Sequence, residues 1–159
     1  MANQIKVGDK APAFTLPDTE LTPRTLQEFL GHKIVIAFFV AAFTDVCTKE
    51  MCAFRDSMAR LTDLEAQVIG ISVNDPFSNK AFAEKNRLTF PVLSDHKRQA
   101  IKAYGVETPN FNGLDGYTVA KRSVFIIDKN GTVRYVWTKD DPTIEPDYEE
   151  IEAALEKIK

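Results

Sequence analysis

The segment Lys33-Ile34-Val35-Ile36-Ala37-Phe38-Phe39 is almost continuously apolar and rich in β-branched and aromatic side chains. This composition predicts a β-strand that is buried on both faces, because a half-exposed strand alternates apolar and polar residues. A strand of this kind lies inside a sheet that helices cover on both sides. The flanking sequence is therefore expected to supply further strands and the helices that cover them.

Other apolar runs in the sequence predict further strands. Residues 68–73 have the same buried character, and residues 90–93 form a shorter run of the same kind. Residues 123–128 and 132–137 flank Asn130-Gly131, and an Asn-Gly pair between two apolar runs is a strong β-hairpin signal. Before the central strand, residues 7–17 are punctuated by prolines and predict an extended segment or a small hairpin.

Helices are predicted between these strands. Residues 46–64 carry apolar side chains at helical intervals of three and four: Met51, Phe54, Met58, Leu61 and Leu64. Shorter helices are expected over residues 25–30 (ending at Gly31), 76–87 (opened by Pro76), 97–104 (ended by Gly105) and 147–158 (preceded by Pro146). Residues 105–121 contain a proline, asparagines and glycines and are expected to be irregular. This order predicts an α/β fold in which helices cover a mixed sheet, with residues 1–159 as a single domain.

Composition and charge exclude several classes of protein. Apolar residues make up 44% and charged residues 27% of the chain, which is typical of a globular protein and not of a disordered one. A net charge of −3 with scattered Lys and Arg argues against nucleic-acid or anionic-membrane partners. The amino terminus lacks the features of a signal peptide, and the uncharged run after Lys33 is too short to cross a membrane. We therefore expect a cytoplasmic protein whose thiols stay reduced.

Cys47 is the first candidate for a reactive, nucleophilic residue. It falls in the first turn of the predicted helix over residues 46–64, directly after the central strand, with Thr44 or Asp45 as the helix N-cap. Free backbone N–H groups and the helix dipole favour a thiolate at this position, and the thiolate is the nucleophilic form of cysteine. The alternative is a buried cysteine that fills a gap in the core.

Cys52 lies five residues further along the same helix. In an intact helix the two Cα atoms are roughly 8–9 Å apart, whereas a disulfide needs them within about 7 Å. Local unwinding would bring the cysteines together, which suits a redox cycle better than a permanent bridge, although Cys52 could also be a core-packing residue. The two cysteines with His32 and His96 show no metal-binding spacing, so no metal site is expected.

Residues 38–50 resemble the active-site segment of the peroxiredoxins, thiol peroxidases with a thioredoxin-like fold, a three-layer α/β/α arrangement. The resemblance extends along the whole chain, and a second cysteine five positions after the first is similar to the peroxiredoxin Q or bacterioferritin-comigratory-protein branch. The other matching segments are Ala11-Pro12-Ala13-Phe14-Thr15-Leu16, Val73-Asn74-Asp75, Leu93-Ser94-Asp95 and Arg122-Ser123-Val124-Phe125-Ile126-Ile127-Asp128.

The resemblance implies a role for each matching residue. Cys47 would attack a hydroperoxide and become a sulfenic acid, and Cys52 would resolve it into a disulfide. Thr44 would hydrogen-bond the thiolate and the peroxide, and Glu50 would hold arginine side chains in position. Arg122 would stabilise the thiolate and the leaving oxygen, although an arginine at a strand start is ordinarily a solvated charge. A thioredoxin-like or glutaredoxin-like protein would reopen the disulfide, with no cofactor, and the chain would be a monomer or homodimer.

One residue departs from the family pattern. Val40 stands where the family normally has proline, which fixes φ and has no N–H group. We expect peroxidase activity to survive but to be weakened, so that Val40→Pro should raise the turnover of peroxide; an unchanged rate would contradict this expectation. Two alternatives stay open from the sequence: a one-cysteine peroxidase with Cys52 as a packing residue, and a slow redox sensor or holdase chaperone. Phe43, Phe77 and Trp137 are candidates for a pocket wall, an oligomer contact or core packing.

Overall fold

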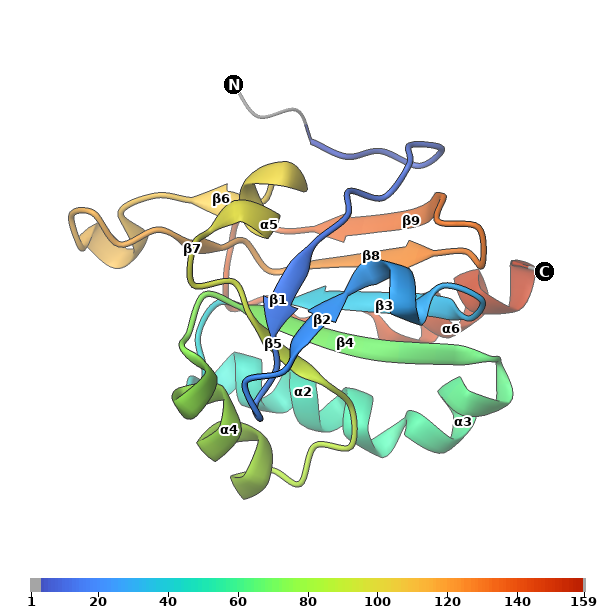
Figure 1. Ribbon diagram of the computed structural model, residues 1–159, viewed down its shortest axis with the longest axis horizontal. Helices are drawn as coiled ribbons and strands as arrows, with labels where there is room; N and C mark the ends of the chain where they lie inside the picture. Colours follow the sequence, from blue (N-terminus) through green and yellow to red (C-terminus); the bar gives the residue numbers. More distant parts are fainter. Residues whose placement is uncertain (1–3, 159) are drawn as a thin grey trace.

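A computed structural model describes residues 4–158 of the chain. Its centre is a five-stranded mixed sheet in the order β5-β4-β3-β8-β9 (Figure 1). The strands are β3 (Lys33–Phe38), β4 (Ala66–Ser72), β5 (Val92–Ser94), β8 (Ser123–Ile127) and β9 (Val133–Thr138). β3, β4 and β5 run parallel to one another. β8 runs antiparallel to its neighbour β3, and β9 runs antiparallel to β8. The predicted α/β architecture with a mixed sheet is confirmed.

β3 is the middle strand, as its composition predicts. All six of its residues are buried, and Val35 pairs with Val68 on one side and with Ile126 on the other. Neither face of the strand reaches solvent because helices and loops cover both. The carboxyl ends of β3 and β4 lie at the same end of the sheet, since the two strands are parallel.

Helices cover the two faces of the sheet in separate layers. On one face, Tyr104 at the end of α5 (Gln99–Ala103) packs against Phe38 and Phe125, with ring centroids 5.3 and 5.1 Å away. On the other face, Met51 of α2 (Asp45–Asp56) lies beside Gly70, where its Sδ is 3.5 Å from the position that a Cβ would occupy. The same face carries α3 (Met58–Asp63), α4 (Pro76–Lys85) and α6 (Tyr148–Lys157).

The prediction of one continuous helix over residues 46–64 is wrong. The chain forms α2 and α3, with a break at Ser57, whose N–H group is shared between the carbonyls of Ala53 and Phe54. The apolar spacing of three and four continues across the break, so it does not reveal the break. Polar side chains such as those of Asp56 and Ser57 favour local hydrogen bonding over a regular helix interior.

Short elements account for the other differences from prediction. Residues 105–121, expected to be irregular, contain the antiparallel pair β6 (Glu107–Thr108) and β7 (Val119–Ala120) and a 3₁₀ turn (Phe111–Gly113). The amino-terminal hairpin forms from β1 (Thr15–Pro17) and β2 (Pro23–Thr25), and α1 (Leu26–Phe29) follows it. Strands of two or three residues are too short to leave an alternation pattern in sequence.

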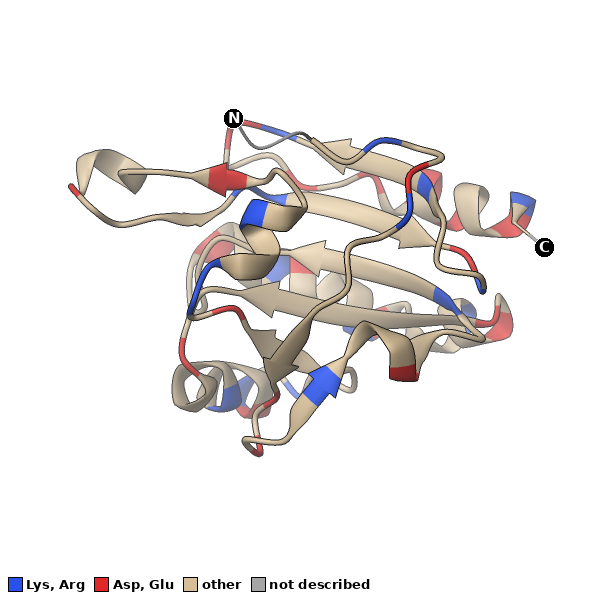
Figure 2. Cartoon of the chain, turned by 45° about the horizontal axis from the view of Figure 1, so that its top comes forward, with Lys and Arg blue, Asp and Glu red and all other residues tan. Residues whose placement is uncertain are grey.

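Gly31 follows α1 with a φ of +102°, as expected of a residue after a helix C-cap. Basic and acidic residues are interspersed over the elements (Figure 2). Within the described residues, no helix has the length and apolar character needed to cross a membrane.

Candidate active site

Cys47 lies in the first turn of α2 with its side chain fully buried. The chain leaves β3 at Phe38, crosses a short loop and enters α2 at Asp45. The backbone N–H groups of residues 45–47 have no acceptor within the helix and stand at the positive end of its dipole. The predicted placement of Cys47 at a helix start is confirmed.

Thr44 occupies the predicted N-cap position, but its side chain caps no N–H group of α2. Its hydroxyl instead donates to the carbonyl of Ala41 at 2.7 Å. Thr44 is therefore the N-cap residue by position, as predicted, but its hydroxyl oxygen accepts no hydrogen bond from an N–H group of the helix. The structure gives no hydrogen bond between Thr44 and Cys47, so the lone pairs of the exposed Thr44 hydroxyl remain available as acceptors.

Arg122 provides the charged partner of Cys47. It precedes β8, and only 2% of its surface is exposed. Its Nη2 donates to Cys47 Sγ at 3.1 Å, and its Nη1 donates to Glu50 Oε1 at 2.8 Å. Nε and Nη2 also donate to the carbonyl of Pro142, at 3.2 and 2.7 Å. The alternative of a solvated strand-start arginine is excluded by this burial.

Glu50 lies one helical turn after Cys47 and is fully buried. Burial raises the pKa of Glu50 to about 7, although the neighbouring Arg122 acts in the opposite direction. Glu145 adds a smaller effect that also raises the pKa. Oε1 is paired with Arg122, whereas Oε2 is a buried atom without a hydrogen-bond partner among the described residues. Near neutral pH this carboxyl therefore exchanges a proton, which changes the charge that faces Arg122.

Among residues 4–158, the hydrogen bonds of Arg122 leave one of its N–H groups free. A guanidinium has five N–H groups. Arg122 donates four hydrogen bonds, one to Cys47, one to Glu50 and two to Pro142. The free N–H is on Nη1, while Nη2 is already at the sulfur. An arginine held in this way presents a fixed positive charge to an anion that forms beside Cys47.

Cys52 lies further along α2 in a half-buried position. Its thiol donates to Asn86 Oδ1 at 3.6 Å, and Arg55 Nη1 donates to the backbone carbonyl of Asn86 at 2.6 Å. Both cysteines are free and both stand in the helix, as predicted for the reduced protein. Asn86 and Pro142 are contacts that the sequence did not indicate. Asn86 follows a helix as an ordinary C-cap residue, and Pro142 acts through its backbone carbonyl, which carries no residue-specific signal.

Val40 is buried at the start of the loop between β3 and α2, with 3% of its surface exposed. Later in this loop Phe43 has a φ of +67°, which is unusual for a residue with a side chain. The Phe43 ring packs edge-on against Phe82 at 5.4 Å, and Phe82 stacks on Phe39 at 5.6 Å. The loop is thus anchored to the core through aromatic contacts.

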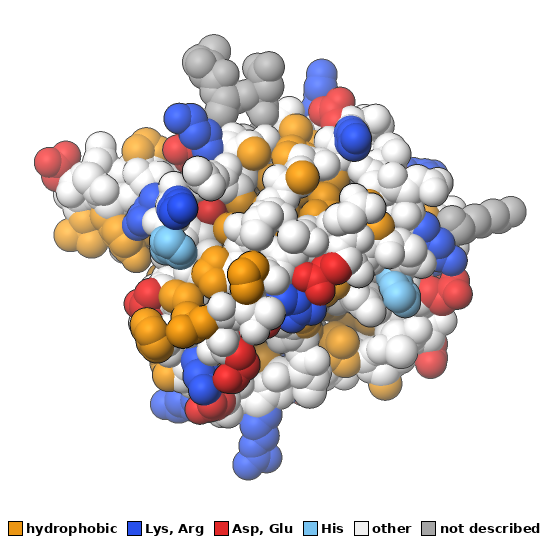
Figure 3. Space-filling view, in the orientation of Figure 1, with side chains coloured by type: hydrophobic (Ala, Val, Ile, Leu, Met, Phe, Trp, Pro, Cys, Tyr) orange, Lys and Arg blue, Asp and Glu red, His pale blue; other side chains and the backbone are white. Residues whose placement is uncertain are grey.

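The three aromatic candidates from the sequence lie in different places. Phe43 and Phe77 are 51% and 70% exposed, and Trp137 is half-buried on β9. Hydrophobic side chains gather on the face seen in Figure 3, toward its lower left near the start of α4. Core packing is therefore wrong for Phe77, whose ring remains largely in solvent. The Phe43 ring is half-exposed and packs with its other part against the buried Phe82.

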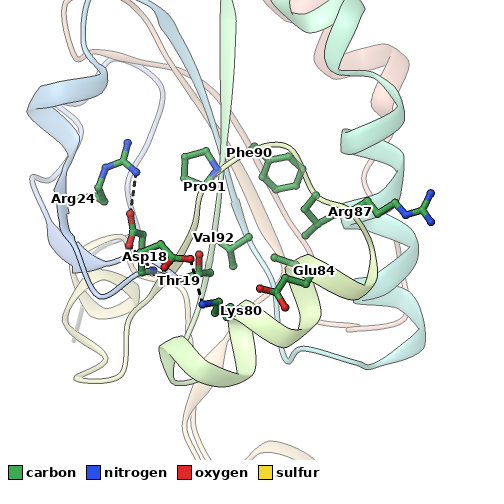
Figure 4. A pocket seen from close by; sticks show the side chains of 12 residues that line it. Asp18, Thr19, Arg24, Lys80, Glu84, Arg87, Phe90, Pro91 and Val92 are labelled. Atoms are coloured by element: carbon green, nitrogen blue, oxygen red, sulfur yellow. Dashed lines mark hydrogen bonds and ion pairs between the residues drawn. The ribbon is translucent and has the colours of Figure 1, made fainter.

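A groove of about 320 Å³ lies between the β1–β2 hairpin and α4 (Figure 4). Four of its charged side chains form two ion pairs, Arg24 with Asp18 at 3.2 Å and Lys80 with Glu20 at 3.4 Å. Glu84 also lines the groove. Arg87 points away from the groove in Figure 4. Neither Cys47 nor Arg122 lines it, so the groove is separate from the cysteine site. The described residues hold no group of three potential metal ligands.

Comparison with known proteins agrees with this geometry. The AhpC/TSA family matches residues 7–136. A protein described as a putative peroxiredoxin of Mycobacterium tuberculosis is 38% identical over 128 residues, which are 79% of this chain and 80% of the relative. The chloroplastic peroxiredoxin Q of Gentiana triflora is 40% identical over 134 residues, 84% of this chain but 59% of the relative. The chain thus spans less than two thirds of the length of that plant protein.

Solved structures give the same result. The peroxidoxin BcpB of Mycobacterium tuberculosis superposes with a TM-score of 0.86 at 31% identity, covering 98% of this chain and 99% of the other. Peroxiredoxin Q of Xanthomonas campestris superposes with a TM-score of 0.78 at 26% identity and 89% coverage of both chains. These superpositions confirm the expected thioredoxin-like fold. The chain belongs to the AhpC/TSA family and, within it, to the peroxiredoxins of the peroxiredoxin Q and bacterioferritin-comigratory-protein type.

Proposed function

We propose that the chain is a thiol-dependent peroxidase that reduces hydrogen peroxide and organic hydroperoxides. The observation that carries the proposal is the buried guanidinium of Arg122, which lies 3.1 Å from Cys47 Sγ. A buried cation beside a cysteine at a helix N-terminus favours the thiolate, which is the reactive form. A structural cysteine in the core needs no such partner.

In the first step the Cys47 thiolate attacks one oxygen of the hydroperoxide. An S–O bond forms while the O–O bond breaks, so that sulfur loses two electrons and the peroxide gains them. The departing hydroxide or alkoxide takes up a proton and leaves as water or alcohol, and Cys47 becomes a sulfenic acid. Arg122 and the free N–H groups of α2 stabilise the charge on the departing oxygen. Thr44, whose oxygen has free lone pairs, accepts a hydrogen bond from the hydroperoxide O–H.

In the second step the Cys52 thiol condenses with the sulfenic acid. A disulfide forms and water leaves, with the proton of the thiol and the hydroxyl of the sulfenic acid as its sources. The two cysteines occupy one helix, so the first turns of α2 must unwind before the sulfurs meet. An external dithiol of the thioredoxin-like or glutaredoxin-like class then reduces the disulfide and closes the cycle.

This cycle needs a compartment in which protein reductants are present, and we propose the cytoplasm as that compartment. The exposed rings of Phe43, in the loop before α2, and of Phe77, at the start of α4, support a homodimer among the two oligomeric states expected from the sequence.

The proposal is tested by mass spectrometry of the reduced protein after brief exposure to stoichiometric peroxide and quenching with an alkylating agent. A loss of two hydrogens with a linked Cys47–Cys52 peptide is the expected result. Oxygen added at Cys47 with Cys52 still alkylated would replace the two-cysteine cycle by a one-cysteine peroxidase. Two fully alkylated cysteines would overturn the peroxidase. A rate of oxidation no faster than that of a free thiol would instead favour a redox sensor or holdase.

A further inference from the structure

The loops that follow β3 and β4 lie side by side at one end of the sheet, because these two strands are parallel neighbours (Figure 1). The first loop, residues 39–44, leads into α2 and Cys47. The second loop carries Asn74 between β4 and α4. The backbone N–H of Ala42 donates to Asn74 Oδ1 at 2.9 Å. A single side chain on the β4 loop thus holds the backbone of the loop that precedes the reactive cysteine.

Asn74 is itself fixed by a network of buried polar groups. Its N–H donates to Ser72 Oγ at 3.2 Å, and its carbonyl accepts hydrogen bonds from Ser94 Oγ and from Asn79 Nδ2. Ser72 in turn donates to Asn79 Oδ1 at 3.0 Å. Ser72, Asn79 and Ser94 are fully buried. These hydrogen bonds hold the backbone of Asn74 in place. Ser72 Oγ also lies 3.3 Å from Asn74 Oδ1, so the amide oxygen that accepts the Ala42 N–H is itself held by the network.

The loop after β3 requires such an external hold. Val40 leaves φ unconstrained at the position where the family pattern has proline. Phe43 adopts a φ of +67°, which is strained for a residue with a Cβ and persists only when its surroundings impose it. Between these two residues, Ala41 accepts the hydroxyl of Thr44 and Ala42 donates to Asn74. The hydrogen bond to Asn74 is therefore placed midway between the unconstrained and the strained residue.

We propose that Asn74 is a positioning residue for the peroxide site: through the N–H of Ala42 it sets the conformation of the loop that places Thr44 and the start of α2. This inference rests on the proposed peroxidase function. Asn74 touches neither Cys47 nor Arg122 and acts on the substrate only through the loop. Its contribution partly substitutes for the missing proline, because both devices restrict the backbone of the same loop.

The first measurement is independent of activity. Hydrogen exchange of the Ala42 amide is compared by NMR in the reduced wild-type protein, in Asn74→Ala and in Asn74→Asp. Asn74→Ala removes the acceptor and should speed exchange by about fivefold, since a hydrogen bond contributes about 1 kcal/mol and about 1.4 kcal/mol is a factor of ten. Asn74→Asp keeps the acceptor oxygen and should retain protection. Unchanged exchange in Asn74→Ala would overturn the proposal.

The second measurement is the rate of Cys47 oxidation by hydrogen peroxide, followed by stopped flow across pH so that the plateau rates are compared. Asn74→Ala should lower the plateau by roughly three- to tenfold, and Asn74→Asp should restore it. The matched control is Asn110→Gly, which removes a similar acceptor, that of the Gly116 N–H at 2.8 Å, from the distant β6–β7 loop and permits the left-handed φ of that position. The control should oxidise at the wild-type rate.

A double-mutant cycle with Val40→Pro completes the test. If proline and Asn74 restrict the same loop, Asn74→Ala should lower the rate less in the Val40→Pro background than in the wild type. An equal fall in the rate of Cys47 oxidation in both backgrounds would overturn the proposal. So would an unchanged rate of oxidation in Asn74→Ala together with faster exchange of the Ala42 amide. In either case the proposed peroxidase function would stand. Equal slowing in Asn74→Ala and Asn74→Asp with lower melting temperatures would show a structural role only. A wild-type protein that does not react would overturn both.

Discussion

The two cysteines share a helix but have different surroundings. Cys47 is fully buried and faces a guanidinium at 3.1 Å. Cys52 is half-buried and faces the neutral amide of Asn86 at 3.6 Å. A buried cation activates a thiol, whereas a neutral acceptor merely holds it. The contrast supports the roles proposed for the two cysteines, with Cys47 as the residue that attacks the peroxide and Cys52 as the residue that resolves the sulfenic acid.

The largest effects are expected from removing each thiol in turn. Cys47→Ser should abolish both peroxide consumption and disulfide formation, because an alcohol is not a nucleophile of comparable strength at neutral pH. Cys52→Ser should leave the first oxidation of Cys47 near the wild-type rate but stop turnover with a disulfide-specific protein reductant. Stopped-flow oxidation and coupled turnover assays separate the two steps. Continued turnover of Cys52→Ser with that reductant would show that Cys52 is not the resolving cysteine.

Removing the cation should have the next largest effect. Arg122→Gln keeps hydrogen-bond donors but loses the charge at Cys47, and the rate of oxidation should fall by about 10²–10³-fold, as for the loss of a donor to a developing anion. Arg122→Lys retains the charge but not the geometry that reaches Cys47, Glu50 and Pro142 together, so it should recover only part of the rate. An equal rate in Arg122→Gln and wild type would show that the helix terminus alone activates Cys47.

Glu50 should make the stability of the cysteine site depend on pH. Its pKa is raised from 4.5 to about 7 by burial, so the folded state keeps a proton that the unfolded state releases between these values. Its contribution to the free energy of unfolding therefore falls as pH rises from 4.5 toward 7 and stays low above it. Glu50→Gln, neutral throughout, should lose this decline. Denaturant titrations at pH 5, below the raised pKa, and at pH 8, above it, would measure the difference.

The same substitution should alter the rate of Cys47 oxidation. Above pH 7 the ionised Glu50 competes with the thiolate for the charge of Arg122. Glu50→Gln should remove an inflection near this pH and change the rate by less than about tenfold. A profile that keeps its inflection in Glu50→Gln would assign that inflection to another group.

The smallest effect is expected at the other end of the helix. Asn86→Leu removes the acceptor of the Cys52 thiol, and a weak hydrogen bond of about 0.5 kcal/mol corresponds to roughly a twofold change. Disulfide formation after Cys47 oxidation should therefore become about twofold faster, because Cys52 is less firmly held in the closed helix. Asn86→Asp retains an acceptor and is the matched control. Slower resolution in Asn86→Leu would show that Asn86 directs Cys52 toward Cys47.

The sequence predicted those features that leave a local pattern. The apolar run of β3, the Asn130-Gly131 turn and the position of Cys47 at a helix start are each encoded by neighbouring residues, and each is confirmed. The sulfur-to-guanidinium contact joins residues 75 positions apart. No periodicity reports such a contact, and Arg122 entered the site only through the resemblance to a family.

Other parts of the site had no signal in the sequence that assigned them a role. The carbonyl of Pro142 is a backbone group, and the amides of Asn74 and Asn86 belong to residues that are ordinary in loops and at helix ends. The break at Ser57 was hidden because the apolar spacing runs through it. Tertiary contacts chose among locally acceptable conformations in each case.

The break at Ser57 also bears on how much peroxide the proposed enzyme tolerates. A sulfenic acid at Cys47 has two fates, capture by Cys52 or a second oxidation to sulfinic acid. The ratio of the rate of helix opening to the rate of reaction with a second peroxide decides between them. Because α2 ends at Asp56, opening needs to melt only part of a 12-residue helix. α3 stays in place, since Arg60 is tied to Glu152 and Glu156 of α6 at 2.9 and 2.7 Å. Under the proposed cycle, we expect a short helix that ends before Ser57 to open without disturbing α3. Opening that outpaces the second oxidation would protect the sulfur from irreversible damage during a burst of oxidant.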